Sequence, residues 1–155
     1  MRNVPPFSET PTLGQLLRQP YERLQKEVYA SLAAHGFPDI RPAHSSLFRY
    51  VAPEGSRVSD LADAAQMTKQ SMAYLTADLE NLGYVTVGPD PQDGRAKRVV
   101  LTERGLSVRS HLIGISLEFE NRCAALIGEA RIRDLRAILA DLTQALGGAT
   151  ESGRS

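Results

Sequence analysis

The sequence has little of what disulfide-stabilised proteins and metal sites need. Its 155 residues include one cysteine, Cys123, and three histidines that lie far apart. A disulfide framework within the chain and a thiolate-rich zinc site are therefore excluded. No histidine stands in an HxxxH or HExxH spacing, and no nucleophile–base pair or phosphate-binding loop is visible. We expect no metal, no cofactor and no enzymatic activity.

An excess of charge of one sign is also missing. Eighteen Lys and Arg residues balance eighteen Asp and Glu residues, which gives a formal net charge of zero. This balance argues against a polybasic coat or an acidic tail. No apolar run approaches the roughly 18–20 residues of a membrane helix, and the N-terminus lacks the apolar core of a signal peptide. We expect a cytoplasmic protein with no membrane partner.

Apolar residues recur every three or four positions over most of the chain, a period typical of helices. The pattern predicts helices over residues 12–35, 42–51, 58–65, 68–82, 102–126 and 129–146. Pro20 lies inside the first of these and is expected to kink it or to mark a late start. Residues 1–11 hold three of the nine prolines and predict a flexible arm, and residues 147–155 predict a flexible tail.

The period changes to two on either side of residues 89–94, where Pro, Asp and Gly predict a turn. Two strands, over 85–88 and 95–101, therefore form a hairpin with a projecting loop. Three helices followed by a hairpin across residues 41–102 predict a winged helix-turn-helix. The fold class is thus mainly α with a small β-hairpin wing, together with a helical dimerisation region formed by residues 12–40 and 103–146.

In a winged helix-turn-helix, the last helix before the hairpin enters the DNA major groove. Here Thr68 is a good N-cap for that helix, and the free amides of its first turn can bind phosphate. Gln70 suits an adenine edge, Lys69 a guanine or a phosphate, and Tyr74 a sugar or a thymine methyl. We expect DNA contacts from Thr68, Lys69, Gln70, Ser71 and Tyr74.

The hairpin carries three cations, Arg95, Lys97 and Arg98, at or just after its loop. A narrow minor groove has an enhanced negative potential that favours arginine, so we expect Arg95 to enter it. Asp93 lies beside this cluster. We expect it to hold Arg95 extended through an ion pair.

Charge alone does not favour DNA binding. Residues 56–104 hold six cationic and seven anionic side chains, a net charge of −1. Only the placement of the cations, at the helix start and on the hairpin, points to DNA. The alternative is a dimeric winged-helix adaptor that binds protein and not DNA.

Four linked segments are residues 59–62 (SDLA), 67–72 (MTKQSM), 79–85 (LENLGYV) and 90–105 (DPQDGRAKRVVLTERG). In their order and spacing they resemble the MarR (multiple antibiotic resistance regulator) family. The flanking helices match in order and rough length, so the resemblance covers nearly the whole chain outside the tails. It implies a homodimeric, usually repressing, transcription regulator that binds double-stranded DNA in the nucleoid. The first, fifth and sixth helices would build the dimer interface, and Arg95 matches the wing arginine that enters the minor groove.

The resemblance also implies a small effector and exposes departures. Many members bind aromatic or phenolic acids, and candidates for such a pocket are Tyr29, His44, Phe48 and Phe119, although core packing explains them equally. Thiol-sensing members carry cysteine in the first helix, whereas Cys123 falls on the apolar stripe of the long helix, where we expect it to be buried. Residues 86–88, Ala73 and Tyr74 replace positions that are often polar or cationic in the family, which reduces cationic contact with DNA.

Overall fold

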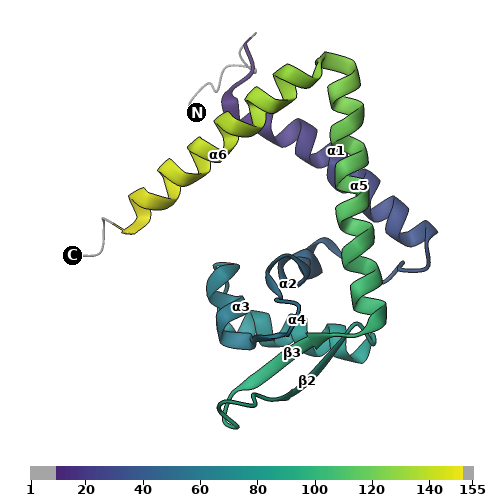
Figure 1. Ribbon diagram of the computed structural model, residues 1–155, viewed down its shortest axis with the longest axis vertical. Helices are drawn as coiled ribbons and strands as arrows, with labels where there is room; N and C mark the ends of the chain where they lie inside the picture. Colours follow the sequence, from purple (N-terminus) through teal and green to yellow (C-terminus); the bar gives the residue numbers. More distant parts are fainter. Residues whose placement is uncertain (1–9, 152–155) are drawn as a thin grey trace, which may run out of the picture. The chain divides into compact units, whose positions relative to one another are not determined.

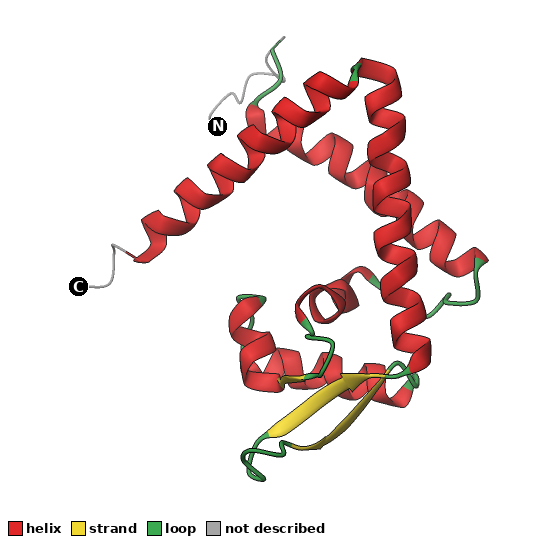
Figure 2. Ribbon diagram, viewed as in Figure 1, coloured by secondary structure: helices red, strands yellow, loops and turns green. Residues whose placement is uncertain are grey.

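The computed structural model describes residues 10–151, without side chains for 148–151. Its elements are α1 (Leu13–Ala34), η1 (Pro42–His44), α2 (Ser45–Tyr50), β1 (Ser56–Arg57), α3 (Val58–Ala64), α4 (Lys69–Asn81), β2 (Val85–Pro89), β3 (Lys97–Leu101), α5 (Glu103–Ile127) and α6 (Glu129–Glu151) (Figures 1 and 2). The chain divides after Ile115 into two compact units. The predicted class, mainly α with a small β wing, is confirmed.

Helix α1 begins at a strong local signal. The Thr12 hydroxyl accepts a hydrogen bond from the Gln15 N–H at 3.3 Å, while the Gln15 side chain accepts from the Thr12 N–H at 2.8 Å. This reciprocal pair is a capping box. The helix continues through Pro20, so the expectation of a late start there is wrong. Of the arm predicted over 1–11, residues 1–9 lie outside the described residues.

The winged-helix region folds around one apolar core in the first unit. Buried side chains from the end of α1, from α2, α3 and α4, from the sheet and from the start of α5 form a continuous cluster. In α4, every third or fourth side chain is buried, at Met72, Leu75, Thr76 and Leu79. This burial follows the predicted period and leaves the opposite face of α4 exposed.

The sheet has one strand more than the sequence predicts. Strands β2 and β3 form the expected antiparallel hairpin, with Val85 opposite Leu101 and Pro89 opposite Lys97. The two residues of β1 pair with the other edge of β3, which gives the order β1-β3-β2. The hairpin loop projects beyond the helices of this unit (Figure 1).

The second unit contains the end of α5 and the whole of α6. Gly128, between them, has a φ of 101°, a conformation that glycine adopts without strain. The Arg136 guanidinium pairs with the Glu120 carboxylate at 2.6 Å and ties the two helices together. Helix α6 extends to Glu151. Residues 147–151 of the predicted flexible tail are therefore helical.

Candidate nucleic-acid interface

The exposed face of α4 carries the side chains that the sequence assigned to DNA reading. Lys69, Gln70, Ser71 and Tyr74 are exposed, while their helical neighbours Met72 and Leu75 are buried. The Tyr74 ring is 68% exposed. An exposed aromatic side chain on a helix whose other face is in the core is available for contact with another molecule.

The start of α4 is held by two hydroxyls that bind each other. The Thr68 hydroxyl accepts from the Ser71 N–H at 3.0 Å and donates to the Ser71 Oγ at 2.8 Å. Thr68 is therefore the N-cap, as predicted. Both hydroxyls help to fix the first turn of the helix.

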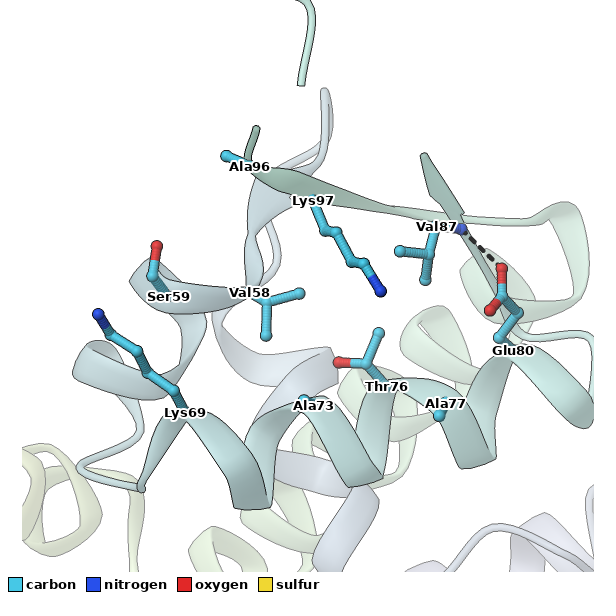
Figure 3. Close-up of a pocket in the computed structure, with 10 residues that line it drawn as sticks. All are labelled: Val58, Ser59, Lys69, Ala73, Thr76, Ala77, Glu80, Val87, Ala96 and Lys97. Atoms are coloured by element: carbon cyan, nitrogen blue, oxygen red, sulfur yellow. Dashed lines mark hydrogen bonds between the residues drawn. The ribbon is translucent and has the colours of Figure 1, made fainter. Parts of the chain in front are cut away.

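A cavity of about 320 Å³ separates α4 from the wing (Figure 3). Its floor is apolar, and Lys97 of β3 reaches into it while Lys69 stands beside Ser59 at its α3 side. The Glu80 carboxylate accepts from the Val87 N–H at 3.0 Å and joins α4 to β2. The cavity is lined by Val58, Ser59, Lys69, Ala73, Thr76, Ala77, Glu80, Val87, Ala96 and Lys97.

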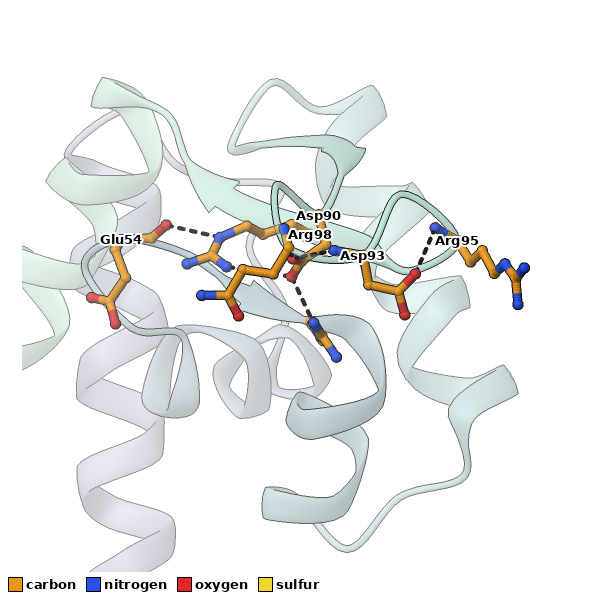
Figure 4. Close-up of polar contacts among 7 residues, drawn as sticks. Glu54, Asp90, Asp93, Arg95 and Arg98 are labelled. Atoms are coloured by element: carbon orange, nitrogen blue, oxygen red, sulfur yellow. Dashed lines mark hydrogen bonds and ion pairs between the residues drawn. The ribbon is translucent and has the colours of Figure 1, made fainter.

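Arg95 lies at the tip of the wing, and its side chain extends away from the loop (Figure 4). The Asp93 carboxylate accepts from the backbone N–H of Arg95 at 3.1 Å. In the described part of the chain, the Arg95 guanidinium has no ion pair. The ion pair expected between the two side chains is therefore absent there, and Asp93 supports Arg95 through the backbone of the turn.

One buried carboxylate organises the base of the wing. Asp90 is 2% exposed, and its Oδ2 accepts from Arg57 at 2.9 Å and from Arg98 at 3.4 Å. Its Oδ1 accepts from the backbone N–H of Gln92 at 2.7 Å. The hydrogen bond from Arg57, followed by that from Gln92, holds the pKa of Asp90 far below its ordinary value. Arg98 also donates to the Glu54 carbonyl at 3.2 Å, so the structure gives it a bracing position.

We expect Asp90→Asn to destabilise the protein in a pH-dependent way. A carboxyl group whose pKa is lowered by folding stabilises the folded state above its unfolded pKa of about 4, and this stabilisation is lost as the pH falls below that value. The midpoint of thermal unfolding of Asp90→Asn should therefore lie well below that of the wild type at about pH 6, and this difference should begin to narrow as the pH falls below about 4. A difference in midpoint that stays constant over this range would contradict the assignment.

Three of the four residues expected to line an effector pocket belong to the first unit, where Tyr29 packs against the core that holds Phe48. His44 and Phe48 are buried in the core at 0% and 2% exposure, which matches the core-packing alternative. Tyr29 is half-buried, and burial raises its pKa. Phe119 belongs to the second unit. Cys123 is also only partly buried, contrary to the expectation of a buried thiol.

Sequence reasoning missed two sets of polar residues. Asp90 with Arg57, and Asp78 with Arg41 and His44, are joined across 33 to 37 positions of the chain. Such long-range pairs leave no periodic trace. The sequence offers one signal for these pairs, which is that the charged residue Asp78 stands close to the buried apolar side chains of α4.

Two further classes of site receive no support from the described residues. Over residues 10–151, no helix is long and apolar enough to cross a bilayer. In the same part of the chain, no group of three or more His, Cys, Asp or Glu residues is placed to hold a metal ion.

Residues 38–96 match the model of the MarR family. Comparison with curated proteins finds no match. Among solved structures, Streptococcus pneumoniae FabT in complex with DNA is similar, with a TM-score of 0.76 and 18% identity over 88% of this chain and 96% of that one. The S. aureus MepR–DNA complex has a TM-score of 0.70 and 22% identity over 86% of this chain and 98% of that one. The transcriptional regulator PA4135 has a TM-score of 0.65 and 26% identity over 87% of this chain and 98% of that one. The resemblance inferred from the four linked segments is confirmed.

Proposed function

We propose that this protein, whose residues 38–96 match the model of the MarR family, is a homodimeric, sequence-specific DNA-binding transcription regulator that acts as a repressor. One observation carries the proposal. The exposed face of α4 and the extended Arg95 side chain are presented by the same compact unit, with the wing base fixed by Asp90. A winged helix needs both elements to engage adjacent grooves of a duplex.

The face of α4 suits the major groove. Gln70 can form a bidentate pair with adenine, Lys69 can reach guanine or a phosphate, and Tyr74 can pack on a thymine methyl. All three side chains are exposed. Thr68 and Ser71 support these contacts by holding the first turn, whose free amides can bind phosphate.

The wing suits the minor groove and its phosphates. Arg95 extends from the loop tip, and the exposed Lys97 side chain reaches into the cavity next to α4. Arg98 contributes by bracing the loop through Asp90. The FabT and MepR structures are DNA complexes of those proteins, and the shared fold supports the same arrangement here.

Exposed apolar residues support a dimer. In α1, Leu13, Leu17 and Tyr21 follow one another at helical spacing and are at least 41% exposed. In the second unit, Leu135 and Ile138 of α6 are 44% and 62% exposed. Large apolar side chains at regular spacing mark contact surfaces, and a second copy that supplies the same surfaces forms a two-fold dimer.

We expect Arg95→Ala to weaken operator binding by about 1–3 kcal/mol and to lower the slope of log affinity against log salt by about 1, because one phosphate or groove contact is lost. Fluorescence anisotropy with a labelled operator at several salt concentrations measures both quantities. Arg133→Ala is the matched control. It removes the same charge from an exposed position on α6, and it should leave the salt slope unchanged.

The adaptor alternative rests on the neutral charge and on the lack of cations at residues 86–88. It predicts that Arg95→Ala has no effect on any duplex, since none would be bound. A gel shift at low salt with DNA from upstream of the chain's own gene separates the two functions. Release by a small aromatic effector, implied by the family, stays a prediction. Of the four residues expected to line its pocket, His44 and Phe48 are buried in the core.

A further inference from the structure

A carboxylate on α4 is held from outside the helix. Asp78 Oδ2 contacts the Arg41 guanidinium and lies 2.9 Å from His44 Nε2. The backbone N–H of Arg41 donates to His44 Nδ1 at 3.1 Å. Because Nδ1 accepts this bond, the neutral ring carries its hydrogen on Nε2, and this N–H donates a hydrogen bond to Asp78. The imidazole is completely buried, and in the described part of the chain its two nitrogens contact only Arg41 and Asp78.

Asp78 places a negative charge close to the side chains of α4 that are proposed to contact DNA. It lies four residues after Tyr74, so the two side chains are neighbours along α4. A carboxylate there repels the phosphates that the same helix is proposed to approach. The hydrogen bond from His44, and then that from Arg41, lower the pKa of Asp78, so it keeps its charge. Electrostatics alone therefore makes Asp78 unfavourable for DNA binding.

Residues 39–41, which include Arg41, also fix the chain just beyond α4. The Tyr84 hydroxyl donates to Asp39 Oδ1 at 2.5 Å and accepts from Arg104 at 3.0 Å. Ile40, between the two polar contacts, is 5% exposed and belongs to the core. Residues 39–41 thus hold α4 at Asp78 and its exit at Tyr84, and they follow α1 after only a short turn.

We propose that Arg41, His44 and Asp78 position α4, the helix proposed to read the major groove. The end of α1 thereby sets the orientation in which α4 meets DNA. Asp78 is a positioning residue and makes no DNA contact itself. This inference rests on the proposed function. It adds a mechanical link, within the first unit, between the helix proposed for dimerisation and the helix proposed for reading.

The test asks whether removing the negative charge of Asp78 strengthens or weakens DNA binding. Asp78→Asn removes one negative charge from α4, which by electrostatics should strengthen DNA binding. Loss of positioning should instead weaken binding to the preferred duplex, by about tenfold if roughly 1.4 kcal/mol of orientation is lost. The control is Asp63→Asn on α3. It makes the same charge change at an exposed side chain for which the described residues show no ion pair.

Affinities are measured by fluorescence anisotropy with full-length protein, a duplex selected by the wild type and a scrambled duplex. We expect Asp78→Asn to lose affinity for the selected duplex only, while Asp63→Asn binds both duplexes at least as tightly as the wild type. Equal binding of the selected duplex by the two variants would overturn the positioning role alone. Wild-type protein that binds no duplex would overturn the proposed function as well.

A second variant covers the case in which Asp78→Asn does not fold. Arg41→Met changes a side chain that is 57% exposed and leaves the carboxylate in place. It should weaken binding of the selected duplex in the same direction. Where both variants fold, the double variant should be no weaker than the weaker single variant, because both break one interaction. Independent, additive losses, or an Arg41→Met variant that binds like the wild type, would contradict the proposal.

Discussion

Ile138→Glu should convert the protein from a dimer to a monomer and reduce operator affinity by at least about 100-fold. The side chain is 62% exposed in the single chain and lies on the apolar stripe of α6, so a dimer interface would bury it. A carboxylate in an apolar interface without a partner costs several kcal/mol. A monomer holds one half-site and loses the gain that comes from linking two reading helices. Analytical ultracentrifugation and fluorescence anisotropy measure the two effects.

Gln144→Glu is the matched control for this prediction. It adds the same charge to an exposed position on the opposite face of α6 and should leave both the dimer and the affinity unchanged. Circular dichroism of both variants checks that α6 is retained. An Ile138→Glu protein that stays dimeric would show that this face of α6 is not in the interface.

Gly105→Ala should cost about 3 kcal/mol of folding free energy, the upper range for overpacking. A Cβ at this position would lie 2.1 Å from the Tyr84 carbonyl oxygen. That carbonyl cannot withdraw easily, because it accepts from the Thr102 N–H at 3.0 Å where β3 leads into α5. The start of α5 would have to move away from the winged-helix core. Urea denaturation followed by circular dichroism measures the loss.

Gly114→Ala, in the same helix, is the control. A Cβ there meets no atom within 4 Å, and replacing glycine by alanine in a helix stabilises it by roughly 0.5–1 kcal/mol. The two variants should therefore shift the free energy of unfolding in opposite directions. If Gly105→Ala were as stable as the wild type, the close approach of α5 to Tyr84 would be wrong.

Local signals predicted most of the fold. The N-cap Thr68, the buried stripe of α4 and the change of period at Val85 are properties of neighbouring residues, so the sequence alone is sufficient for them. Strand β1 has only two residues and exists because β3 offers a free edge, which no local pattern shows. The expectation of a late start at Pro20 is wrong because the capping box at Thr12 starts α1 at Leu13, seven residues earlier.

The candidate site was predictable where it depends on exposure and not where it depends on long-range pairing. The periodicity of α4 indicates that Gln70 and Tyr74 face outwards. The bracing role of Arg98 and the buried position of His44 depend on Asp90 and Asp78, which meet them only after folding. The ion pair expected for Asp93 failed because its carboxylate satisfies a backbone N–H within the same turn.

Selection from a random duplex library tests the central claim most directly, because it needs no knowledge of the operator. Two copies that present α4 and Arg95 by two-fold symmetry should enrich inverted repeats whose half-sites are centred about 10 base pairs apart. Native mass spectrometry of the selected complex should show two chains for each duplex. Failure to enrich any sequence, or enrichment of sites without two-fold symmetry bound by a single chain, would contradict the account.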